Sequence, residues 1–250
     1  MSAVDLLDAA RTLATAPPLE VLRWGVARCP RLGFATGFGP EGCVLIDLIG
    51  RHRLPVDVFT LDTGLLFPET VALWRALEAR YRLTIRAVTP ADTVAAQAAA
   101  LGAELWRRDP DACCARRKLA PLAAEAARLD AWVSAIRRDQ TRDRADAAVV
   151  ERDPRFGLLK LNPLVAWTSA EVWAYLRDHE VPTNPLHARG YPSIGCAPCT
   201  TPVAPGEDPR AGRWRGRGKD ECGLHRRAPE AGARLTVVDA AGLIDLRRAR

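Results

Sequence analysis

Four of the seven cysteines form two pairs whose spacing is typical of a metal centre. Cys113 and Cys114 are adjacent, and Cys196 and Cys199 are separated by two residues. Four thiolates suit either a structural zinc ion or an iron-sulfur cluster. Zinc sites usually place two or more residues between paired ligands, so the adjacent cysteines favour a cluster. In the alternative, the adjacent pair is merely buried and the spaced pair forms a redox dithiol.

Cys222 lies outside both pairs, on a basic and glycine-punctuated segment between Lys219 and His225. Nearby positive charge lowers the pKa of a thiol, and the thiolate is the nucleophilic form. Cys222 is therefore a candidate nucleophile if the segment reaches a substrate. His225 fits a catalytic role and a surface role equally well. Cys29 and Cys43 have apolar neighbours and are expected in the core.

A glycine-rich turn follows an apolar strand predicted at 32–36 and precedes a helix predicted over 43–49. The turn reads Thr36-Gly37-Phe38-Gly39-Pro40-Glu41-Gly42. Free backbone N–H groups and the helix dipole favour a phosphate at such a place. The turn lacks the lysine and spacing of a P-loop, so a tight turn that binds nothing is the alternative. A second turn, Leu61-Asp62-Thr63-Gly64, strengthens the binding interpretation.

Apolar periodicity predicts the elements that carry these turns. Further strands are expected at 56–61, 84–88 and 131–136, and helices at 68–81, 92–102, 119–129 and 169–179, the last with Ser169 as cap. Alternating strands and helices imply an α/β fold with a parallel sheet. Ligands bind beyond the carboxyl ends of such strands, so the loops at 36–42, 61–64 and 137–140 should converge on one site.

The remaining segments have weaker patterns. Residues 141–157 are charged and turn-rich, which predicts a mobile segment. The stretch 182–227 is dense in Pro, Gly and Arg, so a metal centre and a ligand, rather than a core, are expected to hold it. Residues 234–246 alternate around Gly242 and predict a small hairpin.

Composition narrows the class of protein. The chain has 250 residues, 48% hydrophobic and 26% charged, which argues against disorder and allows one large α/β domain. It has neither an eighteen-residue apolar run nor a basic N-terminal signal region, so we expect a cytoplasmic protein with reduced thiols and no membrane contact. The net charge of +6 fits an anionic partner, a solvated surface or a nucleic-acid arm.

Taken together, these motifs resemble the adenylyl-sulfate reductases, the iron-sulfur branch of the sulfonucleotide reductase family. The resemblance runs from about Thr36 to His225. Besides the turns and cysteine pairs, it rests on Arg117-Lys118, Ile136-Arg137-Arg138-Asp139-Gln140, Asn162-Pro163-Leu164, Tyr191-Pro192-Ser193-Ile194-Gly195, Arg210-Ala211-Gly212-Arg213-Trp214 and Glu221-Cys222-Gly223-Leu224-His225. So long a series in one order is specific to the family.

The resemblance implies a fold and a set of sites. The fold would be a Rossmann-like parallel sheet of the adenine-nucleotide α-hydrolase type. Residues 1–30 would be an N-terminal helical segment, 31–200 the α/β domain, and 201–250 a tail with the catalytic cysteine. One 4Fe-4S cluster per chain would be held by Cys113, Cys114, Cys196 and Cys199. Lys118 would reach between cluster and substrate, both turns would hold the adenosine, and Arg137 would lie beside the nucleotide.

The resemblance also implies an activity. Arg210 and Arg213 would grip the phosphosulfate of adenosine 5′-phosphosulfate while the Cys222 thiolate attacks its sulfur. AMP would leave an S-sulfocysteine, from which thioredoxin would release sulfite, as in assimilatory sulfate reduction and cysteine biosynthesis. Arg215-Gly216-Arg217-Gly218-Lys219 departs from the family, which often has tryptophan and acidic residues there. Residues 226–250 match no known segment and are expected to be either a contact in a homo-oligomer or a frayed end.

Three rival interpretations remain at this point. The first is reduction of the 3′-phosphorylated nucleotide, since the two cysteine pairs are the sole sequence argument against it. The second is a cluster-containing tRNA-thiolating enzyme that uses the basic tail on RNA. The chain lacks interleaved aromatic residues and a separate RNA-binding domain, so we expect no nucleic-acid partner. A zinc-stabilised nucleotide-binding regulator without chemistry is a third, simpler interpretation.

Overall fold

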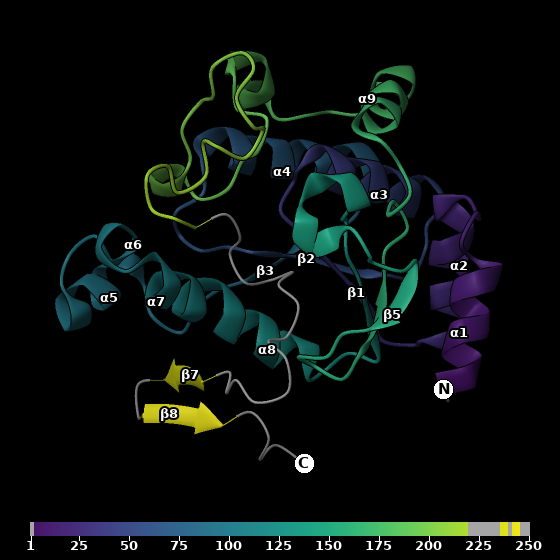
Figure 1. The fold of residues 1–250 in the computed structure, drawn as a ribbon, viewed down its shortest axis with the longest axis horizontal. Helices are drawn as coiled ribbons and strands as arrows, with labels where there is room; N and C mark the ends of the chain where they lie inside the picture. Colours follow the sequence, from purple (N-terminus) through teal and green to yellow (C-terminus); the bar gives the residue numbers. More distant parts are fainter. Residues whose placement is uncertain (1–2, 220–235, 240–241, 246–250) are drawn as a thin grey trace.

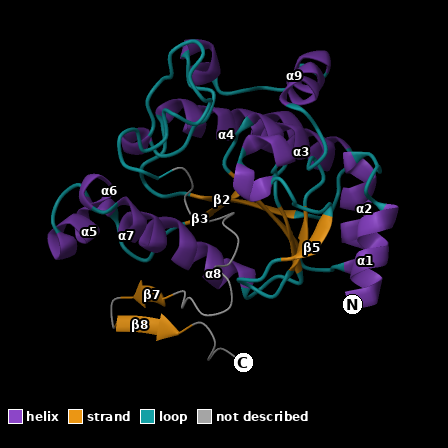
Figure 2. Ribbon diagram, viewed as in Figure 1, coloured by secondary structure: helices purple, strands orange, loops and turns teal. Residues whose placement is uncertain are grey.

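A six-stranded sheet forms the centre of the computed structural model, which describes residues 3–219, 236–239 and 242–245 (Figure 2). The strand order is β3-β2-β1-β4-β6-β5, with all neighbours parallel except β5 and β6. The strands are β1 (Leu32–Thr36), β2 (Asp57–Leu61), β3 (Arg86–Val88), β4 (Ala131–Val133), β5 (Val150–Arg152) and β6 (Leu159–Leu161). The predicted α/β fold with a mostly parallel sheet is confirmed.

Helices cover both faces of this sheet. They are α1 (Ala3–Thr12), α2 (Pro18–Arg28), α3 (Pro40–Arg51), α4 (Pro68–Tyr81), α5 (Val94–Leu101), α6 (Leu105–Arg108), α7 (Pro110–Cys114), α8 (Ala120–Ala126) and α9 (Ser169–Asp178). Figure 1 shows α3 and α4 on one side of the sheet and α8 on the other, with α1 and α2 at the β5 edge. Shorter helical turns are η1 (Ala115–Leu119), η2 (Arg138–Gln140), η3 (Arg142–Arg144), η4 (Pro185–Arg189) and η5 (Ala197–Cys199).

The core lies mainly between the sheet and α3, whose residues 42–49 are all buried. Phe34 of β1 is fully buried in the same cluster. A smaller cluster under α8 contains Phe59, Leu122 and Trp132. Burying such apolar surface is the main force that holds these layers together. Cys29 and Cys43 are buried in the first cluster, as their apolar neighbours predicted.

Several elements differ from the sequence expectation. The strand predicted at 131–136 ends at Val133, and the segment predicted to be mobile, 141–157, contains η3 and β5. β5 and β6 have three residues each, too few for periodicity to reveal them. The cap of α9 is Thr168 rather than Ser169, because the Thr168 hydroxyl accepts the Glu171 N–H in a capping box.

The hairpin predicted near the carboxyl end is confirmed in its strand pairing. β7 (Thr236–Asp239) pairs with β8 (Gly242–Asp245) in antiparallel register. Gly242 is the first residue of β8 rather than a residue of the turn. None of the helices in the described ranges has the length and apolar character of a membrane span.

Candidate active site

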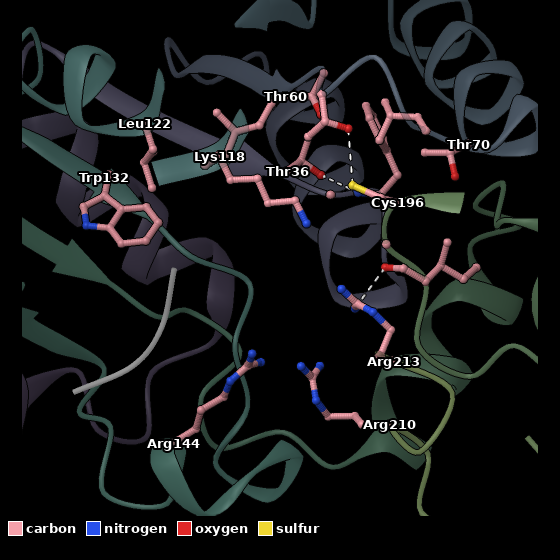
Figure 3. Close-up of a pocket in the computed structure, with 18 residues that line it drawn as sticks. Thr36, Thr60, Thr70, Lys118, Leu122, Trp132, Arg144, Cys196, Arg210 and Arg213 are labelled. Atoms are coloured by element: carbon pink, nitrogen blue, oxygen red, sulfur yellow. Dashed lines mark hydrogen bonds between the residues drawn. The ribbon is translucent and has the colours of Figure 1, made fainter. Parts of the chain in front are cut away.

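A cavity of about 220 Å³ opens where β1 and β2 end (Figure 3). Two predicted loops meet there, since the cavity is lined by Thr36, Gly37 and Phe38 from the first turn and by Leu61 and Thr63 from the second. Its other lining residues are Ala35, Thr60, Leu66, Thr70, Lys118, Leu122, Trp132, Arg144, Ile194, Gly195, Cys196, Arg210 and Arg213. The predicted convergence at the carboxyl ends of the strands is therefore observed for these two loops.

The first turn is held in an unusual backbone conformation. Phe38 has φ 58°, and its N–H donates to Thr36 Oγ1 at 3.1 Å. The Phe38 ring packs on Trp74, with centroids 5.8 Å apart. A Cβ on Gly42 would come within 2.8 Å of Thr36 Oγ1, so glycine is needed for α3 to start this close to β1. The turn thus presents the amino end of α3 beside the cavity.

The four paired cysteines surround a second, smaller cavity of about 10 Å³. Cys113 and Cys114 end α7, whereas Cys196 precedes η5 and Cys199 is its last residue, so two distant segments meet here. Cys196 lies 3.3 Å from Thr63 Oγ1 and pairs through a β-bridge with Leu66. The sequence predicted this meeting, and the six described cysteines all carry free thiols.

Burial and the neighbouring thiols raise the pKa of Cys113 to about 11. Burial, together with the Cys196 thiol, also raises the pKa of Cys199, while Lys118 opposes this shift. These two side chains are therefore neutral thiols at neutral pH, and any metal that binds them must displace protons. Within the described ranges, no group of three or more His, Cys, Asp or Glu side chains is arranged to hold a single metal ion.

Lys118 connects the two cavities. It lines both of them, as does Cys196, so the cysteine pocket and the larger cavity share a wall. Lys118 lies in η1, a single π-helical turn inserted directly after Cys114. Such an insertion shifts the phase of the following side chains and is frequent at functional sites. Figure 3 shows the Lys118 side chain extending into the larger cavity.

Arg117, the neighbour of Lys118, braces the second turn from inside the protein. Its Nε donates to the Thr63 carbonyl at 2.6 Å, and its Nη1 donates to Gln97 at 3.2 Å. Arg117 is buried, and its charge opposes the upward pKa shift of Cys113. It therefore ties the Thr63 loop to the helix that follows the adjacent cysteines.

Three arginines line the side of the cavity away from the strands (Figure 3). Arg210 and Arg213 both donate to Ser193 Oγ, at 3.5 and 3.3 Å. Arg144 approaches from η3 and donates to Gln140. Their guanidinium groups give this wall a positive charge suited to phosphate or sulfate oxygens. The sequence pointed to Arg210 and Arg213, whereas Arg144 was missed because its segment was predicted to be mobile.

A glycine makes room for one of these arginines. A Cβ on Gly195 would come within 2.4 Å of Arg213 Nη2. Gly195 precedes Cys196, and Arg213 pairs through a β-bridge with Thr200, just beyond the second cysteine of that pair. The loop that contains Cys196 and Cys199 therefore packs directly against Arg213 of the positively charged wall.

Other predicted site residues lie elsewhere. Arg137 is buried and does not line the cavity; its Nε donates to Glu41 at 2.8 Å and its Nη1 to Asp139 at 2.6 Å. Glu41 is thus a partner of Arg137. Gly39, Glu41, Asp62 and Gly64 also do not line the cavity, although they belong to the two turns around it. The third predicted loop, 137–140, therefore braces the first turn through Arg137. Cys222 and His225 lie outside the described residues.

Comparison with known proteins identifies the family. The phosphoadenosine phosphosulfate reductase domain matches residues 31–202. The adenosine 5′-phosphosulfate reductase of Halalkalibacterium halodurans is 44% identical over 89% of this chain and 97% of its own. The phosphoadenosine 5′-phosphosulfate reductase of Gloeobacter violaceus is 47% identical over 82% of this chain and 88% of its own.

A solved structure shares the fold. The phosphoadenylyl-sulfate reductase of Candida auris, in a phosphate complex, superposes with a TM-score of 0.73 at 31% identity. That alignment covers 80% of this chain and 98% of the fungal one. The resemblance inferred from the motifs is confirmed, and the chain belongs to the phosphoadenosine phosphosulfate reductase family.

Proposed function

We propose that this protein reduces adenosine 5′-phosphosulfate to sulfite and AMP, with Cys222 as nucleophile and thioredoxin as reductant. One observation carries the proposal: the cavity beyond β1 and β2 shares Lys118 and Cys196 with the pocket of four cysteines. A nucleotide bound at the strand ends would then lie between the cysteine pocket and the arginine wall. Such an arrangement serves the transfer of an anionic group.

The four cysteines fit a 4Fe-4S cluster better than a single zinc ion. All four cysteines line one pocket, so the four thiolates that one cubane cluster needs are present at one place. Zinc sites usually place two or more residues between paired ligands, so the adjacency of Cys113 and Cys114 favours the cluster.

The side chains around the cavity have separable roles in this proposal. Arg210 and Arg213 would bind the phosphosulfate oxygens, and Arg144 adds a third cation on the same wall. The turns at 36–42 and 61–64 would hold the adenosine. A bound cluster would supply a rigid, electrostatically active wall beside the substrate, with no change in oxidation state required. Lys118 would place a positive charge between that wall and the substrate.

Thiols would carry the two electrons of the reduction. The Cys222 thiolate attacks the sulfate sulfur, the bond from that sulfur to the phosphate oxygen breaks, and AMP leaves an S-sulfocysteine. A thioredoxin thiolate then attacks Cys222 Sγ and expels sulfite, forming a mixed disulfide. The second thioredoxin thiol resolves this disulfide, so thioredoxin is oxidised and the Cys222 thiol is restored.

We expect a strong preference for adenosine 5′-phosphosulfate over its 3′-phosphorylated form. The four cysteines support the unphosphorylated nucleotide, which is also the substrate named for the Halalkalibacterium relative. The name of the Gloeobacter relative makes the 3′-phosphorylated nucleotide the second candidate. The tRNA-thiolating alternative gains no support from the family match.

The measurement is kcat/KM for both nucleotides, using anaerobically purified protein with thioredoxin. Equal kcat/KM values would contradict the preference, and a reversed ratio would make the 3′-phosphorylated nucleotide the substrate. Absence of sulfite from both nucleotides would reject the proposed function as a whole.

We also expect about four iron and four sulfide per chain after anaerobic purification, because four thiolates complete one cubane cluster. Iron and acid-labile sulfide analysis, with the visible absorbance spectrum, measures this. Cys199→Ser should lower the iron content, whereas Cys29→Ser should not, since Cys29 is buried in the core away from both cavities. Stoichiometric zinc in place of iron would contradict the cluster.

A further inference from the structure

A lysine near the end of the described chain is tied to the helix that carries the adjacent cysteines. Lys219 is 8% exposed, and its Nζ lies 2.5 Å from Asp111 Oδ1 and 3.3 Å from the Pro110 carbonyl. Asp111 and Pro110 begin α7, which ends at Cys114. The residues that lead into the Cys222 segment are therefore fastened to the cysteine pocket.

A second contact fastens the same stretch. Arg217 Nη1 donates to the Arg107 carbonyl at the end of α6. Two long side chains from residues 217–219 thus reach the same short segment, 107–111. A single contact of this kind would be ordinary for a surface loop, whereas two contacts orient the chain as well as anchor it.

Trp214 connects this anchored stretch to the active-site cavity. Its ring centroid lies 5.2 Å from Lys219 Nζ, 4.5 Å from the Arg213 guanidinium and 5.8 Å from Lys118 Nζ. The backbone N–H of Trp214 donates to the Cys199 carbonyl at 3.0 Å. Lys118 and Arg213 line the cavity, so the Trp214 ring contacts both Lys219 and two residues of the cavity wall.

The charge distribution makes Asp111 important to this arrangement. The Lys219 side chain is 4% exposed, whereas the Asp111 side chain is 75% exposed. A buried ammonium group without a counter-charge is strongly unfavourable, while a solvated carboxylate without one is not. Removing the Asp111 carboxylate should therefore release Lys219 from its buried position rather than displace α7.

We propose that the Asp111–Lys219 ion pair is a clasp that holds the base of the Cys222 segment beside the cavity, so that both are positioning residues. The proposal rests on the proposed role of Cys222. Three residues of chain span at most about 10 Å, so a fixed Lys219 limits how far the Cys222 backbone can move from this anchor. Confinement of a nucleophile raises its effective concentration at the reacting atom without changing substrate affinity.

Asp111→Asn tests the clasp directly. We expect the single-turnover rate of Cys222 sulfonation to fall about tenfold, with AMP affinity and iron content unchanged, because neither the cavity lining nor the cysteines are altered. Asp111→Glu, which keeps the carboxylate, should restore most of the rate. Glu104→Gln is the matched control, since Glu104 pairs with Arg107 at an exposed position in the same region.

A second measurement separates the clasp from the proposed chemistry. Amide hydrogen exchange of residues 213–219 should speed up in Asp111→Asn and remain unchanged in Glu104→Gln. Unchanged exchange would overturn the clasp whatever the protein catalyses. Wild-type sulfonation in Asp111→Asn, or a rate loss that follows loss of iron, would overturn its positioning role. If the wild-type protein sulfonates no cysteine while exchange does respond, the clasp stands and the proposed function fails.

Discussion

Replacing Cys222 with serine is expected to abolish turnover, lowering kcat by more than about 1000-fold. A serine hydroxyl remains protonated at neutral pH, so the attack is lost. Serine also has no sulfur atom that a thiol could attack to expel sulfite and form a mixed disulfide, so the discharge is lost as well. The variant should still bind AMP and keep its iron, because the substitution alters none of the described residues that line the cavity and none of the four paired cysteines. Steady-state kinetics, AMP titration and iron analysis measure the three properties.

The wild-type protein provides the positive counterpart. Mixed with adenosine 5′-phosphosulfate in the absence of reductant, it should release one AMP per site and gain the mass of a sulfonate on the peptide that contains Cys222. Reduced thioredoxin should then discharge sulfite and restore the original mass. The mechanism is wrong if the sulfonate maps to another cysteine, or if Cys222→Ser forms sulfite at a near wild-type rate.

Arg210→Ala and Arg213→Ala should each reduce kcat/KM by about 100-fold to 1000-fold. Each guanidinium lines the cavity, and both donate to Ser193, so each helps to form the positive wall. A guanidinium can bind two oxygens of phosphate or sulfate at once, which alanine cannot replace. Steady-state kinetics at saturating thioredoxin measure the loss of kcat/KM. Iron content should be unchanged, because the four cysteines proposed to bind the cluster are not altered.

Arg215→Ala is the matched control for this pair. Arg215 lies two residues beyond Arg213 but pairs with the exposed carboxylate of Glu207 and does not line the cavity. Its removal should leave kcat/KM within about twofold of wild type, since surface ion pairs contribute little. Full activity of both Arg210→Ala and Arg213→Ala would instead assign those two arginines to a solvated surface.

The sequence by itself determined the parts of the site that local chemistry encodes. The strands at 32–36 and 56–61, each followed by a turn, were predictable because apolar runs and glycine-rich turns act over a few residues. The cysteine pairs were recognisable from spacing, and Arg210 with Arg213 from the family motif. The parallel sheet followed from alternation of strands and helices, and it explains why Thr36 and Thr63 meet in one cavity.

Contacts between segments far apart in the sequence decided which other side chains line the cavity. Arg137 was expected beside the nucleotide, yet its guanidinium pairs with Glu41 and Asp139 and does not line the cavity. Arg144 lines the cavity instead, although its segment has no periodicity that would have predicted this. Lys118 lies in a π-helical turn and lines the cavity, and an ion pair joins Asp111 to a lysine 108 positions away. Such contacts depend on which segments the fold brings together. Neither helical propensity nor residue spacing carries that information, because both describe neighbours along the chain.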